Sequence, residues 1–286
     1  MEWAFLRSAK FFFTKGGNLM KKVLCILLAG IIFLTGCVCA FAATTYGELI
    51  SGVLEDMSTI NDSCSGAPQQ TANGAYRLAE MLAIIALEQD TTGKYSSMIS
   101  NVLDTMDSNN AKCNGAPQQI ANGTYRCVEL LAIIGYELDT YGVYSELIGD
   151  ILDDWESNDK QCSGAPQQAV NGLYRSVELL AIIAYESDAS GRYHDVIANV
   201  LESWEANNKQ CNGAPQQAAN GAYRMVELMA IIAYTNDYTR NWSDTVDAVL
   251  DDMEDNNSRC SGAPQQQANG LYRAVEMGAI IAYELQ

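Results

Sequence analysis

Apolar and polar residues follow a helical period along most of the chain, in blocks that recur every 49 residues. Ahead of each of five cysteines, the apolar positions advance by steps of three and one, as in Leu49, Ile50 and Val53. This spacing predicts an amphipathic helix. After each cysteine, a run such as 174–186 is apolar over most of its circumference. Each block therefore predicts two helices, the second more deeply buried than the first.

Local signals mark where these helices begin. Thr45 and Glu48 have the spacing of a capping box, which predicts a helix that starts directly after Thr45. One proline follows each of the five cysteines and suits the first turn of a helix, where the missing N–H costs little. These prolines are Pro68, Pro117, Pro166, Pro215 and Pro264. The pair Asn171-Gly172 marks either a delayed helix start or a place where two helices approach closely.

The blocks are five copies of one unit. They share the string C-[SN]-G-A-P-Q-Q-x-x-N-G-x-Y-R-x-x-E at a constant spacing of 49 residues, without insertions. We therefore predict an all-α fold of five tandem αα-hairpin repeats, at about 46–94, 95–143, 144–192, 193–241 and 242–286. Near-identical units favour a curved, open α-solenoid. The absence of polar end units favours the alternative, a closed α/α toroid, whose narrow centre we expect side chains to fill.

The first 43 residues differ in kind from the repeats. A basic Met20-Lys21-Lys22 segment, an apolar stretch and the motif Ala40-Phe41-Ala42 predict a signal peptide over 20–42, ahead of a repeat domain over 43–286. Residues 1–19 are interpreted as an untranslated upstream extension. Two alternatives remain open: a lipoprotein with Cys37 as the lipidated residue, or an uncleaved membrane anchor. Each predicts export to the periplasm, the cell surface or the medium.

The composition limits which partners and which kinds of site the protein can have. The formal net charge of -18 argues against nucleic acid or an anionic membrane surface as the main partner. The single histidine excludes sites that need two or more histidines, such as triads of His ligands and paired-His zinc sites. The Asp255-Asn256-Asn257 segment lacks the ligand pattern of an EF-hand, and we find no phosphate-binding loop or nucleophile elbow. We therefore predict no metal, no cofactor and no catalytic residue.

Four polar residues recur in every unit at helical spacing, so they share one helix face. We call this set the polar stripe. It consists of Gln70, Asn73, Arg77, Glu80, Gln119, Asn122, Arg126, Glu129, Gln168, Asn171, Arg175, Glu178, Gln217, Asn220, Arg224, Glu227, Gln266, Asn269, Arg273 and Glu276. One interpretation is structural, with Arg and Glu paired and the amides bound to backbone. The other places the stripe on an inner surface, as a ladder that binds an extended peptide or a glycan.

Two further columns accompany the stripe. Tyr76 and its equivalents beside each arginine are expected to be packing residues with a wet hydroxyl group. The recurrent cysteines are expected to be small buried residues, because equivalent positions in stacked units lie too far apart for disulfides. They are Cys64, Cys113, Cys162, Cys211 and Cys260.

The regularity of the units bears on function. Catalysis needs a place where the symmetry breaks, and no unit differs in length or holds a carboxylate pair of its own. We therefore predict a non-enzymatic binding or scaffold module for a peptide, glycan or protein partner, acting through the polar stripe. The first alternative is a polysaccharide-processing α/α-toroid enzyme that uses acidic residues. The second is a self-assembling surface protein, whose uncapped ends stack as a homo-oligomer.

Overall fold

The computed structural model describes residues 45–286, and within them it is built of ten helices without strands. The first helices of the units are α3 (Tyr46–Ser63), α5 (Ser96–Asn110), α7 (Ser145–Asp159), α9 (His194–Asn208) and α11 (Ser243–Arg259). The second helices are α4 (Ala67–Gln89), α6 (Ala116–Leu138), α8 (Ala165–Ser187), α10 (Ala214–Asn236) and α12 (Ala263–Glu284). The all-α prediction is confirmed. The predicted extension, signal peptide and Cys37 lie outside the described residues.

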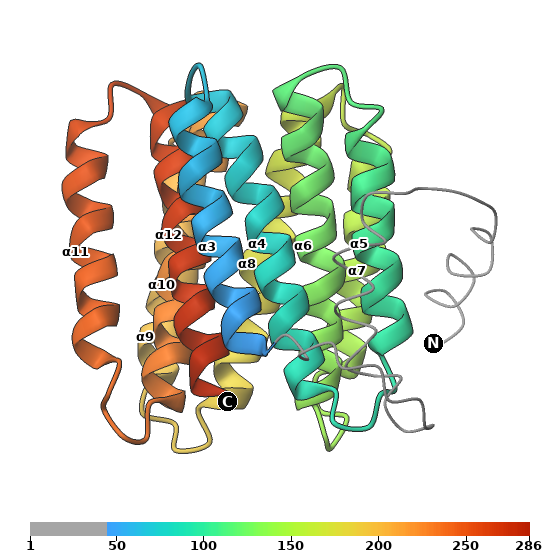
Figure 1. The fold of residues 1–286 in the computed structure, drawn as a ribbon, viewed down its shortest axis with the longest axis vertical. Coiled ribbons are helices and arrows are strands. Elements are labelled where there is room, and N and C mark those ends of the chain that lie inside the picture. Colours follow the sequence, from blue (N-terminus) through green and yellow to red (C-terminus); the bar gives the residue numbers. More distant parts are fainter. Residues whose placement is uncertain (1–44) are drawn as a thin grey trace.

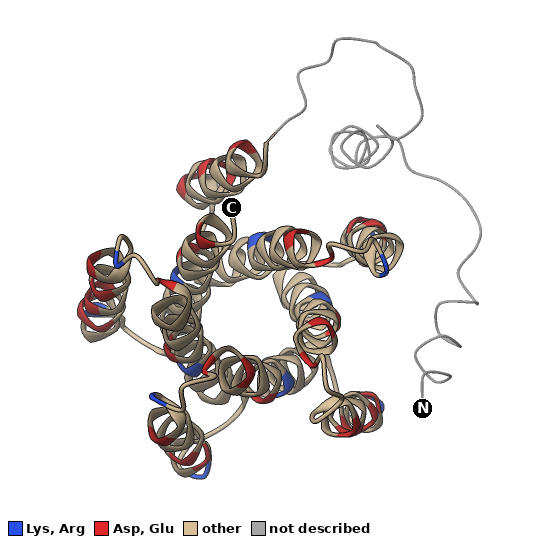
Figure 2. Ribbon diagram, turned by 90° about the horizontal axis from the view of Figure 1, so that it is seen from below, with Lys and Arg blue, Asp and Glu red and all other residues tan. Residues whose placement is uncertain are grey.

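The second helices form a ring, and the first helices stand around it as a spaced outer layer (Figure 2). Each outer helix contacts the inner helix of its own unit and that of the preceding unit. The ring closes because α12 packs against α4, with Leu271 beside Gly74. Figure 1 shows the two ends of the repeat array side by side, and the Ser51 and Tyr283 hydroxyl groups lie 2.9 Å apart.

The open α-solenoid favoured from the sequence is therefore wrong for the described residues, and the ring has the closed arrangement that was kept as the alternative. The physical reason lies in the contact between neighbouring inner helices. A Cβ at Gly123 would lie 2.8 Å from the Cβ of Ala75, and one at Gly172 would lie 2.8 Å from Thr124 Oγ1. Because neighbouring inner helices pack this closely, the rotation from one unit to the next can be large enough to close the ring. Hydrophobic periodicity carries no information about the rotation between units.

Of the two interpretations of Asn171-Gly172, the close approach is the one observed. Helix α8 runs through this pair without a break, and each inner helix holds a glycine at the same position. The other local predictions also hold. Thr45 and Glu48 form the capping box at the start of α3, and a proline occupies the first turn of every inner helix.

The centre of the ring is filled by side chains. Gly278 of α12 faces Met81 of α4 and Met229 of α10, the helices on its two sides, so this position points to the interior. One turn earlier on the same face stands a column of residues that are each at most 1% exposed. We call it the axial column: Leu78, Cys127, Ser176, Met225 and Ala274. Unlike the polar stripe, it holds a different residue in every unit.

Among the residues that the structure describes, none of the helices combines the length and the apolar character that a membrane crossing requires.

Candidate functional site

The asparagines of the polar stripe attach each inner helix to the outer helix of its own unit. The side-chain amide of Asn122 donates to the Met106 carbonyl at 2.9 Å, and that of Asn171 donates to the Trp155 carbonyl at 3.0 Å. The other three asparagines make the same bond, from Asn73 to Met57, from Asn220 to Trp204 and from Asn269 to Met253. Each bond uses the second acceptor position of an outer-helix carbonyl and gives the buried or half-buried asparagine amide a partner, so it stabilises the helix pair.

The arginines and glutamates of the stripe form an ion-paired network on the same side. Arg175 donates to Glu178 one turn along α8 at 2.7 Å and lies 3.7 Å from Asp154 of α7. Its guanidinium group also covers the Tyr174 ring, 5.0 Å from the ring centre. The Arg–Glu pair and the stacking on tyrosine recur in all five units, at Arg77, Arg126, Arg224 and Arg273 as well.

Burial dominates the electrostatics of this network. It raises the pKa of Glu80 to about 7, although the neighbouring Arg77 acts to lower it. Burial likewise raises the pKa of Glu129, Glu178, Glu227 and Glu276, against the effect of their arginines. The arginine Nε atoms are enclosed without a hydrogen-bond partner. The ion pairs are thus part of the packed interior between the two layers.

Of the two interpretations of the stripe, the one that places it on an inner surface does not agree with this placement, and the one that pairs Arg with Glu and binds the asparagine amides to backbone does. Asn, Arg and Glu point away from the ring axis, toward the outer layer, because the axis is occupied by the axial column and its neighbours. Three of the four stripe positions are therefore engaged in contacts within the protein. The fourth, the glutamine, lies on the side of the helix that faces the preceding unit, where Gln217 makes no side-chain hydrogen bond within the described residues.

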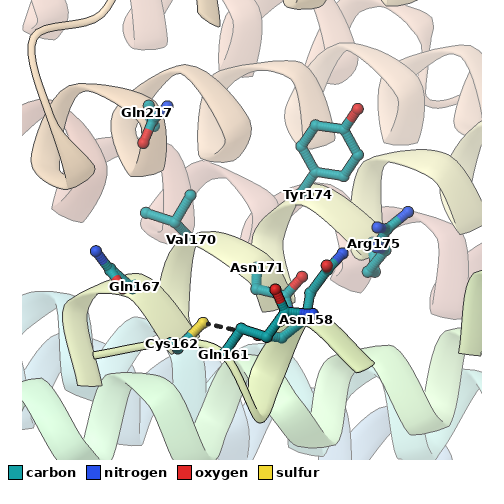
Figure 3. Close-up of a pocket in the computed structure, with 9 residues that line it drawn as sticks. All are labelled: Asn158, Gln161, Cys162, Gln167, Val170, Asn171, Tyr174, Arg175 and Gln217. Carbon is teal, nitrogen blue, oxygen red and sulfur yellow. Dashed lines mark hydrogen bonds between the residues drawn. The ribbon is translucent and has the colours of Figure 1, made fainter. Parts of the chain in front are cut away.

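Gln217 lines a groove between the third and fourth units, near the start of the inner helices (Figure 3). The groove has a volume of about 510 Å³. Six of the nine residues that line it carry amide or hydroxyl groups: Asn158, Gln161, Gln167, Asn171, Tyr174 and Gln217. The other three are Cys162, Val170 and Arg175. The equivalent groove between the first and second units has a volume of about 440 Å³ and is lined by Gln69, Asn73, Tyr76 and Gln119 among others. We call these the inter-unit grooves.

In the groove between the third and fourth units, Tyr174 offers its hydroxyl group and not its ring, whereas the hydroxyl group of Tyr76 in the other described groove donates to Asp107. Trp204 of α9 packs on the Tyr174 ring at 4.1 Å between centroids, and Arg175 covers it as well. Burial raises the pKa of Tyr174, so its hydroxyl group stays protonated at neutral pH. The expectation of a packing tyrosine with an accessible hydroxyl group agrees with this geometry. Sequence reasoning missed Asn158 and Gln161, because only the fold brings the end of α7 beside α8.

The recurrent cysteines sit at the edges of these grooves and are only partly buried. The Cys162 thiol donates to the Asn158 carbonyl at 3.4 Å, and Cys113 and Cys211 make the same contact. Burial raises the pKa of Cys162, which keeps this thiol protonated at neutral pH. Within the described residues all cysteines are free thiols, and no group of three or more His, Cys, Asp or Glu side chains is arranged to hold a metal ion.

Comparison of the chain with protein-family models, with curated proteins and with solved structures gives no match.

Proposed function

We propose that the protein is an exported, multivalent binding module that holds its ligand in the inter-unit grooves. The observation that carries the proposal is the recurrence of one amide-lined groove between equivalent units. Export is supported by the signal-like segment at 20–42. In the two described grooves the stripe glutamines, Gln119 and Gln217, keep their amide groups available, whereas Asn, Arg and Glu of the stripe make contacts within the protein and Gln168 donates to Asp159.

The ligand that best fits a groove is a neutral glycan. Carboxamide groups donate and accept hydrogen bonds, as sugar hydroxyl groups do. The nearby Arg175 is already paired with Glu178 and Asp154, so it does not call for an anionic ligand. Peptides are commonly recognised by an exposed sheet edge, an apolar groove or an aromatic-lined groove, and the described groove offers none of these. Its volume falls within the range of small-ligand sites.

Repetition adds to the affinity that one shallow groove provides. Equivalent sites on one rigid ring suit a ligand that itself repeats, since the second contact with a polymer is made at high effective concentration. We therefore expect weak binding of single sugars and much tighter binding of chains long enough to reach two grooves.

The test is isothermal titration of the purified protein with neutral oligosaccharides chosen from a glycan array. Gln217→Leu removes the free amide from one groove and should lower the number of bound short glycans by one. The matched control is Asn199→Leu, the same kind of change at an exposed position of α9 away from the described groove. Equal stoichiometry in both variants would exclude the groove as the site.

Other results would select other functions. Preferential binding to a peptide array probed in parallel would favour a peptide-binding module. Turnover of any polysaccharide would favour the toroid enzyme. The stacking hypothesis relied on uncapped ends, and those ends are packed against each other in the ring. A concentration-dependent mass in light scattering would nevertheless restore self-assembly as the function.

A further inference from the structure

Four of the five inner helices carry a glutamate at the same place in their last turn. They are Glu88, Glu137, Glu186 and Glu284. At least one carboxylate oxygen of each is enclosed and lacks a hydrogen-bond donor. The last turns hold no basic residue, and a helix C-terminus is the negative end of the helix dipole. An ionised carboxylate is poorly stabilised in this position.

Three of these glutamates also face an aspartate of the preceding unit. The negative charge of Asp90 acts on Glu137, that of Asp139 acts on Glu186, and that of Asp237 acts on Glu284. Two neighbouring carboxyl groups hold one proton more readily than two negative charges. The glutamates therefore sit where one unit meets the next, and their ionisation places like charges across that boundary.

The aspartates are the partners that stay ionised. Asp90 accepts hydrogen bonds from the Ser96 hydroxyl group and the Tyr95 amide, both at 2.8 Å, at the start of the next outer helix. Burial acts to raise the pKa of Asp90, but these hydrogen bonds outweigh it and the pKa lies below its usual range. Asp139, Asp188 and Asp237 are held in the same way. The proton of each pair thus belongs to the glutamate.

The surrounding charges differ between boundaries. Lys94 also faces Glu137 and partly offsets Asp90. Glu88 has Tyr46 nearby and no aspartate of a preceding unit, because Gln286 stands 49 residues after Asp237. At the boundary between α8 and α10 the glutamate is replaced by Thr235, and Asp188 instead lies 4.0 Å from the His194 imidazole. This boundary lacks the glutamate, so it serves as an internal control for the four boundaries that have one.

We propose that Glu88, Glu137, Glu186 and Glu284 are proton-binding sites at the unit boundaries, which hold the ring more tightly in mildly acidic than in neutral solution. The proposal is independent of any ligand. It rests on enclosed carboxylate oxygens without donors, at helix C-termini, three of them beside a second carboxylate. It gives an exported protein a stability that follows the acidity of its surroundings.

The direction of the effect follows from the pKa values. Burial raises the pKa of Glu88, and burial together with the neighbouring aspartate raises those of Glu137 and Glu186, each to about 7, and that of Glu284 to about 8. An unfolded glutamate has a pKa of about 4.3. The stability that these groups contribute is therefore fully present below about pH 4.3 and is lost as the pH rises through about 7 to 8.

The test compares thermal unfolding of the purified protein between pH 5 and pH 8, a range in which the aspartates stay ionised. The boundary variant combines Glu88→Gln, Glu137→Gln, Glu186→Gln and Glu284→Gln. Its control combines Glu55→Gln, Asp153→Asn, Glu202→Gln and Asp251→Asn, which removes the same charge from exposed positions of the outer helices. The Glu80 column is unchanged in all variants, so its contribution cancels.

We expect the Tm of the unmodified protein to fall by about 5 °C or more from pH 5 to pH 8. The boundary variant should lose at least half of that fall and have the higher Tm at pH 8, while the control keeps the fall. Thr235→Glu should lower the Tm at pH 8 and leave it nearly unchanged at pH 5. Equal pH dependence in the boundary variant and the control, or no effect of Thr235→Glu, would overturn the proposal.

Discussion

The periphery and the axis of the ring follow opposite rules. In every unit, the inner-helix Asn donates to an outer-helix carbonyl, and Arg pairs with Glu and stacks on Tyr. Along the axis, the same helices hold Leu78, Cys127, Ser176, Met225 and Ala274, which differ in size and polarity. The sequence repeat is therefore strict between the inner and outer helices of each unit and relaxed where the five inner helices meet at the axis.

The two regions differ because the units share the volume at the axis but not the volumes at the periphery. Each peripheral network lies in a volume of its own, so five identical sets of side chains fit without conflict. The axis is one volume shared by all units, in which five large side chains would overlap and five small ones would leave a void. Gly278 shows the compromise, because its missing side chain makes room for Met81 and Met229. The five axial side chains must therefore fit one another, so the residue at one position depends on the residues at the other four.

The strongest way to break the ring is to separate two inner helices. Gly123→Leu adds a Cβ only 3.0 Å from the backbone carbonyl carbon of Ala75, so α4 and α6 must move apart. We expect a loss of more than about 3 kcal/mol in the free energy of unfolding, measured by urea denaturation. The control is Gly52→Ala on α3, which meets nothing within 4 Å and should stabilise the protein by about 0.5–1 kcal/mol. Similar values for the two variants would contradict the close contact.

The shared axial volume is tested by moving one side chain across it. Met225→Ala leaves a cavity and should cost about 2–4 kcal/mol in the free energy of unfolding. Adding Ala274→Met on the neighbouring helix should restore about half of that loss, since both residues border the same space. Denaturation of the two single variants and the double variant measures the coupling. Strictly additive losses would show that the five positions pack independently.

A smaller effect compares the two regions directly. Asn73→Ala, Asn220→Ala and Asn269→Ala each remove the same two hydrogen bonds, one to an outer-helix carbonyl and one to an outer-helix asparagine, and should each cost about 1–2 kcal/mol. Because their surroundings repeat, we expect the three losses to agree within about 0.5 kcal/mol, a spread that independent sites commonly show. Alanine at Leu78 and at Cys127 should instead give clearly different losses. Scattered values for the asparagines would contradict the equivalence of the periphery.

Much of the secondary structure could be predicted from the sequence. The apolar steps around Leu49, the capping box at Thr45 and the prolines such as Pro166 each have a local physical cause, and each is found where the pattern places it. The sequence allowed two interpretations of Gly172, a delayed helix start or a close approach of two helices, and the structure shows the close approach. These successes concern interactions within one helix or one turn.

The direction in which the stripe faces could not be predicted in the same way. Periodicity shows that Asn171, Arg175 and Glu178 share a face, but every face of an inner helix is covered, either by its neighbours, by the outer layer or by the axis. Polarity therefore does not reveal which face is which. The axial column carries a signal of a different kind, which periodicity does not capture. A buried position that varies from Leu78 to Ser176 between near-identical units must occupy an environment that the units do not repeat.

Because the ring is closed, all five boundaries between units are structurally alike. The boundary between α12 and α4 is packed like the others, and a Cβ at Gly47 would lie 3.4 Å from the Gln286 side chain. A second copy of the four-residue turn Thr91-Thr92-Gly93-Lys94 would join Gln286 to Tyr46, and the chain could be opened instead between Gly191 and Arg192. We expect this circular permutant to fold into the same ring with nearly unchanged stability. The same arrangement of units in space would then be reached from a different order of units along the gene.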